Sequence, residues 1–102
     1  MDLSELVVEH FEPRIGQVFT VRLDAGQAVE TRLISATRLG PASSPPQGRR
    51  AFSLVFLGPM SPVLRQSIYT VEHTELGALD IFIVPVGPDG EQRGMRYEAV
   101  FT

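Results

Sequence analysis

Two histidines are the side chains of this sequence best suited to proton transfer near neutral pH. His10 and His73 are the only side chains whose ordinary pKa lies in that range. With Asp80 and a serine such as Ser53, His73 would supply the residue types of a Ser–His–Asp hydrolase. The chain lacks the Gly-x-Ser-x-Gly sequence that holds such a serine on a sharp turn. We therefore predict no catalytic residue, and we expect His73 to end a strand and to be hydrogen-bonded to the following turn.

Carboxylates stand next to both histidines, which raises the question of a metal site. Glu9 precedes His10 and Glu72 precedes His73, but adjacent residues point to different sides of a helix or a strand. We therefore predict no metal ligands. The chain also lacks a phosphate-binding loop and a Gly-x-Gly-x-x-Gly sequence, so we predict no cofactor. The residues that we single out as a candidate polar or interaction site are His73, Asp80, Glu72, Tyr69 and Phe82.

These candidates all lie in residues 67–86, which predict two strands around a turn at 75–77. The first arm alternates in the manner of a half-buried strand, with Tyr69, Val71 and His73 on one face. The second arm, 79–86, has apolar side chains on both faces and therefore needs cover on both. We expect a helix at the amino end to supply the outer cover. Phe82 is then buried, and Phe82→Ala is expected to cost about 3–5 kcal/mol.

The turn leaves two registers open for this hairpin. A three-residue loop that ends at Gly77 pairs Val71 with Ile81 and puts Glu72 opposite Asp80, a like-charge pair that costs little on a wet face. A two-residue loop of residues 76–77 pairs Val71 with Phe82 instead, and it holds a leucine at a positive φ. We predict the first register, because glycine suits the left-handed position of a bulged hairpin.

The rest of the chain predicts one short helix and four more strands. A helix over residues 3–12 has a single apolar stripe that includes Leu6 and Phe11, and Pro13 ends it. A bulge is expected at Leu33-Ile34, where the alternation of the second strand breaks. The four strands are expected at 15–24, 28–39, 51–57 and 95–101.

Six strands without a helical crossover favour antiparallel pairing. The predicted fold is mainly β, a six-stranded antiparallel small barrel or roll with one short N-terminal helix. It forms a single domain over 1–102, with the barrel or roll over 15–102 and a Pro-, Gly- and Ser-rich mobile loop over 40–50. In the connection after residue 58, we expect Met60, Val63 and Leu64 to fold back over one end of the core.

Composition excludes several classes of function. The chain has 102 residues and a net charge of −3, so little would drive binding to nucleic acid phosphates. It has no cysteine, which excludes a disulfide framework and thiol chemistry. The acidic amino end is unlike a signal peptide, and no apolar run approaches the ~20 residues of a membrane helix. We therefore expect a soluble cytoplasmic protein that binds neither nucleic acid nor membrane.

Several runs of residues resemble a family of short bacterial proteins known only as a domain of unknown function. They are Phe52-Ser53-Leu54-x-Phe56-x-Gly58-Pro59, Pro62-Val63-Leu64-x-Gln66-x-x-Tyr69, Glu72-His73-x-Glu75-Leu76-Gly77-x-x-Asp80-x-Phe82-x-Val84-Pro85-Val86-Gly87 and Tyr97-Glu98-Ala99-Val100-Phe101. The resemblance covers nearly the whole chain and implies no activity, cofactor or catalytic residue. Because members of the family accompany phage-tail-like proteins of the tail-collar type, it implies an assembly or accessory role.

These observations favour a non-enzymatic protein-interaction or assembly module, accessory to a phage-tail-like structure. The alternative is a small-ligand-binding barrel or a minor hydrolase that uses His73 and nearby carboxylates, which requires a concave pocket beside that histidine. The partner is expected to be another protein or a second copy. Unless the barrel closes, the last strand presents an unpaired edge that neither lysine nor proline protects. Such an edge can pair with a second copy, and two-fold homodimers are the commonest closed assembly. We therefore predict a homodimer.

Overall fold

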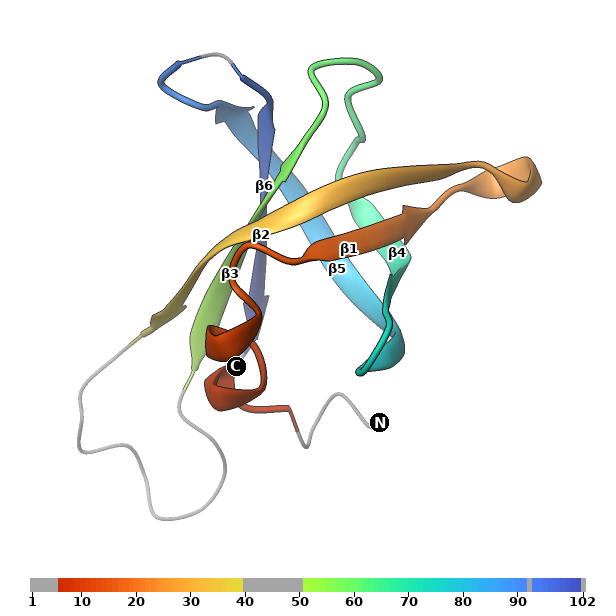
Figure 1. Cartoon of the computed structure of the whole chain (residues 1–102). Helices are drawn as coiled ribbons and strands as arrows, with labels where there is room; N and C mark the ends of the chain where they lie inside the picture. Colours follow the sequence, from red (N-terminus) through yellow and green to blue (C-terminus); the bar gives the residue numbers. More distant parts are fainter. Residues whose placement is uncertain (1–5, 40–50, 92, 102) are drawn as a thin grey trace.

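The described residues fold into a closed barrel of six antiparallel strands (Figure 1). The structure is a computed structural model that describes residues 6–39, 51–91 and 93–101. Its strands are β1 (Val18–Arg22), β2 (Ala28–Arg38), β3 (Phe52–Gly58), β4 (Ser67–His73), β5 (Gly77–Pro88) and β6 (Met95–Phe101). The predicted fold class is therefore confirmed. The predicted mobile loop at 40–50 and the first residues of the predicted helix lie outside the described residues.

Two meanders of three strands each build the barrel. Neighbouring strands follow the order β1-β2-β3-β6-β5-β4, and β1 pairs with β4 to close the ring. The last strand, β6, pairs with β3 over its whole length, from Phe52 opposite Phe101 to Gly58 opposite Met95. It also pairs with β5 on its other side. The last strand is thus not an edge, and the edge argument for a homodimer no longer applies.

Both registers predicted for the central hairpin are wrong. In the structure Tyr69 lies opposite Ile81, and Val71 lies opposite Leu79. The reason is that Gly77, with φ 79°, is not the last residue of the loop but pairs with His73 as the first residue of β5. The left-handed glycine therefore follows a loop of residues 74–76, as in a bulged hairpin. The expected opposition of Glu72 and Asp80 does not occur.

Side chains fill the barrel, and the amino-terminal turns plug one end. Phe11 lies among Phe19, Phe52 and Phe101, with ring centroids 6.3, 5.9 and 6.1 Å away, respectively. Figure 1 shows these turns, in red, at the end of the barrel where β6 finishes. Leu6 from the same segment is also fully buried. The apolar stripe of the predicted helix therefore packs inside the barrel.

The helix prediction needs two corrections. First, the described segment consists of the 3-10 turns η2 (Val8–His10) and η3 (Glu12–Arg14), so it extends beyond the predicted end at residue 12. Pro13 does not stop it, because the first turn of a helix has no use for the missing N–H. Second, the segment does not cover the outer face of β5. Phe82 is 49 % exposed and Ile68 opposite it is 67 % exposed, whereas Leu79, Ile81 and Ile83 point inward.

β2 and the connection after β3 shape the other end of the barrel. The predicted bulge is confirmed, since the pairing of β2 with β3 shifts between Leu33 and Ser35.

In the connection after β3, only Leu64 is buried. Met60 and Val63 are exposed, so the prediction for these two was wrong. The backbone N–H of Leu64 donates a 2.8 Å hydrogen bond to the hydroxyl of Tyr97 inside the barrel. This bond joins the backbone of the connection to the barrel at Leu64. 

Candidate functional site

His73 lies at the end of β4 with only 7 % of its surface exposed. Its Nδ1 accepts hydrogen bonds from the backbone N–H groups of Glu75, at 3.0 Å, and Leu76, at 3.3 Å. Because Nδ1 accepts, Nε2 carries the hydrogen, and it donates to the Oε1 atom of Gln17 at 2.7 Å. The ring also packs on Phe19, with centroids 4.7 Å apart. The predicted bond between His73 and its turn is confirmed, and Gln17 is a partner that the sequence did not indicate.

The surroundings of His73 favour the neutral form of its imidazole and lower its pKa. Burial lowers its pKa most, the guanidinium of Arg14 lowers the pKa further, and the carboxylate of Glu75 acts in the opposite direction. Arg14 and Glu75 form an ion pair of 3.5 Å next to the ring. A second proton on the ring would have to sit on Nδ1, where two N–H groups already point. The geometry therefore suits a residue that holds a turn better than one that exchanges protons.

The carboxylates predicted to work with His73 lie on the outside of the barrel. Asp80 accepts a 2.8 Å hydrogen bond from the hydroxyl of Thr70, the residue opposite it in β4. Glu72 forms a 2.5 Å ion pair with Arg22 of β1. Both side chains are engaged with partners on neighbouring strands, and neither contacts the imidazole. The structure therefore does not assemble an acid–base pair from these residues.

The serine considered for a hydrolase is remote from His73. Ser53 lies in β3, which is separated from β4 by two strands on each side of the barrel. It is 7 % exposed and lies between Thr37 of β2 and Val100 of β6. Within the described ranges, no group of three His, Cys, Asp or Glu side chains is placed to hold a metal ion.

The two aromatic candidates have different positions. Tyr69 is half-buried, and its hydroxyl donates a 2.7 Å hydrogen bond to the carbonyl of Arg65. Phe82 lies directly opposite Ile68 on the outer face of β4 and β5. We call Ile68 and Phe82 the outer apolar pair. Together the two side chains make an exposed apolar surface on the outside of the barrel.

A hollow of about 380 Å³ lies beside His73. Its lining consists of Val18, Thr20, Glu72, His73, Thr74, Gly77 and Ala78. The ligand-binding alternative requires such a hollow. Both ring nitrogens of His73 are already bonded within the fold, however, so the histidine offers no free polar atom to a ligand.

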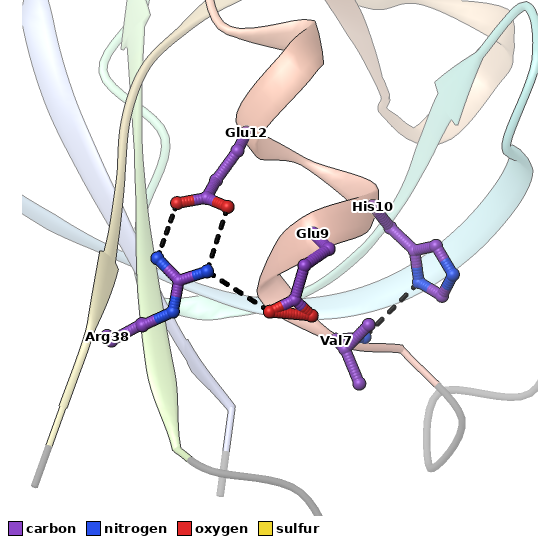
Figure 2. Close-up of polar contacts among 5 residues, drawn as sticks. All are labelled: Val7, Glu9, His10, Glu12 and Arg38. Carbon is purple, nitrogen blue, oxygen red and sulfur yellow. Dashed lines mark hydrogen bonds and ion pairs between the residues drawn. The ribbon is translucent and has the colours of Figure 1, made fainter. Parts of the chain in front are cut away.

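A second polar cluster fastens the amino-terminal plug to β2 (Figure 2). Arg38 donates two hydrogen bonds to the carboxylate of Glu12, at 2.6 and 3.0 Å, and a third to Glu9 at 3.1 Å. These bonds, chiefly the one to Glu12, raise the pKa of Arg38. Figure 2 also shows the Nδ1 atom of His10 accepting a 3.2 Å bond from the N–H of Val7. The cluster is a structural clamp at the surface, and its acidic residues are satisfied by the arginine.

A groove along β2 was not predicted from the sequence. It has a volume of about 560 Å³ and runs along one half of β2. Residues 28–32 form one wall, and residues 57–59 with Pro62 and Arg93 form the rest, together with Val18. A signal was present in the sequence, because the second predicted strand is longer than the third, which pairs with it. Only the strand pairing in the structure reveals which part of the longer strand lacks a neighbour on the β3 side.

The comparisons with known proteins place the chain in a family. Residues 6–101 match a domain of unknown function, DUF6916. The chain belongs to this family. Neither a curated protein nor a solved structure matches the DUF6916 chain. None of the helices in the described part of the chain is long and apolar enough to cross a membrane.

Proposed function

We propose that this DUF6916 domain is a protein-interaction or assembly module that does no chemistry of its own. The observation that carries the proposal is the outer apolar pair, in which Ile68 is 67 % and Phe82 49 % exposed. The two side chains lie opposite each other on adjacent strands, so they form one continuous apolar contact. Burial of such a contact by a partner removes apolar surface from water and favours association.

Two further observations support binding at the surface over binding inside. The barrel interior is occupied by aromatic and aliphatic side chains, among them the fully buried Phe11, Phe19 and Phe56. His73, the residue on which the hydrolase alternative depends, has all its polar atoms bonded within the fold. The ligand-binding and hydrolase alternative therefore has less support than the interaction module.

The first partner to test is a second copy of the chain. Two-fold homodimers are the commonest closed assembly, and a two-fold axis through the outer face would bring the two copies of the apolar pair together. An accessory role in a phage-tail-like structure, which the family resemblance implies, and a cytoplasmic location remain parts of this proposal.

Size-exclusion chromatography with light scattering tests the homodimer. We expect the molar mass to rise towards twice the monomer mass with concentration, and Phe82→Ser to return it to the monomer mass. Val63→Ser is the matched control, because Val63 is 54 % exposed but lies in the connection between β3 and β4. A monomer mass for the wild-type chain at every concentration contradicts self-association through this face. Turnover of a substrate that His73→Ala abolishes would overturn the interaction module itself.

A further inference from the structure

One half of β2 has a strand neighbour on only one side. Residues Ala28 to Arg32 pair with β1, but the pairing with β3 begins only at Arg32 opposite Leu57. β3 ends at Gly58, and the chain then turns away. Figure 1 shows the turned end of the β1–β2 hairpin, in orange, reaching away from β3. Residues 28–31 therefore form an open edge of the barrel sheet.

The direction of the backbone groups along this edge follows from the hydrogen bonds at its two ends. The carbonyl of Gln27 accepts from Leu23 at 2.8 Å, and the N–H of Leu33 donates to Gln17 at 3.1 Å. The odd-numbered residues of this half of β2 thus point their N–H and C=O groups toward the β1 side. Because these directions alternate along an antiparallel pair, Ala28 and Glu30 point theirs toward the open edge. Among the described residues, these groups have no backbone partner.

The groove of about 560 Å³ lies along this edge. Its opposite wall contains Leu57, Gly58, Pro59 and Pro62. Proline has no backbone N–H, so this wall is poorly suited to pair with the edge. Apart from Arg93, which forms ion pairs with Asp89 and Glu91, the wall is apolar. The groove therefore combines unpaired backbone groups on one side with an apolar surface on the other, which is the arrangement that an extended peptide requires.

We propose that this groove binds an extended segment of a partner protein, which adds as a strand to residues 28–31 of β2. The segment has about four residues in the groove, or roughly 13 Å of extended chain. Its backbone pairs with Ala28 and Glu30, and its apolar side chains contact Leu57 and the prolines. An arginine or lysine in the segment would complement Glu30, which is exposed and has no ion pair among the described residues.

A single strand fits this site better than a second copy of the domain. The edge of β2 is backed by β1, so a second copy would bring a two-stranded hairpin to a groove that already has an opposite wall. The inference rests on the proposed interaction function, because it names the class of partner. It uses a surface different from the outer apolar pair, however, and so the two can fail separately.

Hydrogen exchange of the free protein provides the first test. We expect the amides of Ala28 and Glu30 to exchange rapidly, and those of Val29 and Thr31, which face β1, to exchange slowly. Slow exchange at Ala28 and Glu30 in the free protein would mean that the edge is already paired and would overturn the proposal.

Binding is tested with a labelled peptide, Thr-Val-Arg-Val-Thr-Val-Arg-Thr, by fluorescence anisotropy and by the same exchange measurement. We expect the peptide to slow exchange at Ala28 and Glu30. The matched control is the same peptide with alternate backbone amides N-methylated, which keeps its charge and side chains but cannot pair on the methylated edge. Equal binding of both peptides, or protection elsewhere with none at these two amides, would overturn strand addition.

Variants separate this site from the outer apolar pair. Glu30→Pro removes an N–H that points away from β1, and proline is tolerated on strand edges, so we expect the fold to be retained. Loss of one backbone hydrogen bond is expected to weaken peptide binding about fivefold or more. If this variant unfolds, Glu30→Lys serves instead, and we expect it to weaken the arginine-containing peptide. Binding that Phe82→Ser abolishes and both Glu30 variants preserve would overturn the groove site while leaving the interaction function standing.

Discussion

The imidazole of His73 uses both of its nitrogens inside the fold. Nδ1 accepts from two N–H groups of the turn, and Nε2 donates to Gln17, which precedes β1. The ring therefore ties the β4–β5 turn to the neighbouring strand at the place where the barrel closes. Protonation of the ring would remove the acceptor on which the turn depends. The chemistry of this residue is thus a source of pH-dependent stability.

The direction of that pH dependence follows from the lowered pKa of His73. Its ordinary value is 6.5, and burial and Arg14 place the native pKa below it. As the pH falls through about 6.5, the unfolded chain takes up the proton first, and the free energy of unfolding decreases until the native pKa is reached. Urea unfolding between pH 8 and 5 measures this loss. His73→Asn, which cannot titrate but retains an acceptor, should reduce it, whereas His10→Asn should leave the His73 contribution in place.

A second residue-scale prediction concerns Tyr97, whose hydroxyl accepts a hydrogen bond from the backbone N–H of Leu64 inside the barrel. Tyr97→Phe leaves that buried N–H without a partner, so we expect a loss of about 1–3 kcal/mol in the free energy of unfolding. Tyr69→Phe is the matched control, because its hydroxyl bonds a carbonyl at the exposed surface. Urea denaturation of both variants measures the difference, and equal losses would show that the Leu64 bond carries no special weight.

At the scale of elements, the amino-terminal turns are held by two different kinds of contact. Phe11 provides apolar contact inside the barrel, and Arg38 provides hydrogen bonds at the surface. The turns are too short to be stable alone, since isolated helices of this length are marginal. Their order therefore depends on the barrel, and the clamp by Arg38 limits how they open.

Removal of the clamp is expected to loosen the turns without unfolding the barrel. In Arg38→Ala, we expect faster hydrogen exchange at the amide of Phe11, which bonds the carbonyl of Val8 at 2.9 Å. Arg96→Ala is the matched control, because Arg96 is exposed on β6 and has no ion pair in the part of the chain that the structure describes. Exchange at Phe11 that is unchanged in Arg38→Ala would show that the apolar plug alone holds the segment.

At the scale of the whole molecule, the barrel separates buried from exposed aromatic residues. Phe56 is 1 % exposed and Phe82 is 49 % exposed. Phe56→Ala is therefore expected to cost about 3–5 kcal/mol, the usual cost of a buried phenylalanine. Phe82→Ala should cost about 1 kcal/mol or less, because it removes only a cross-strand contact with Ile68. Thermal or urea unfolding of both variants checks this, and similar losses would indicate that Phe82 is covered in solution.

Much of this architecture could be predicted from local alternation. The inward residues of β6 and the bulge at Leu33 follow from residue patterns that the sequence displays directly. The register of the β4–β5 hairpin could not be fixed in this way, because moving Gly77 from the loop into the pair with His73 changes every pairing. The prediction that Phe82 is covered was wrong, because the sequence shows that a strand face is apolar but not whether the fold buries that face.

The candidate site was less predictable than the fold. The bond between His73 and its turn is local, but its bond to Gln17 spans 56 residues and depends on barrel closure. The pairing of Glu72 with Arg22 is equally long-range. The open edge at residues 28–31 depends on where β3 ends relative to β1. These features arise from the meeting of distant strands, which local patterns do not specify.

The order of the strands also makes the two halves of the chain complementary. Each meander is continuous in sequence, and the connection at residues 59–66 joins them. If the chain were cut there, each fragment would be a three-stranded sheet with an uncovered apolar face and two unpaired edges. The edges of one fragment are those that the other pairs with, β1 with β4 and β3 with β6. The barrel therefore divides into matched halves for a split reporter, whose signal would appear only when the two fragments are brought together.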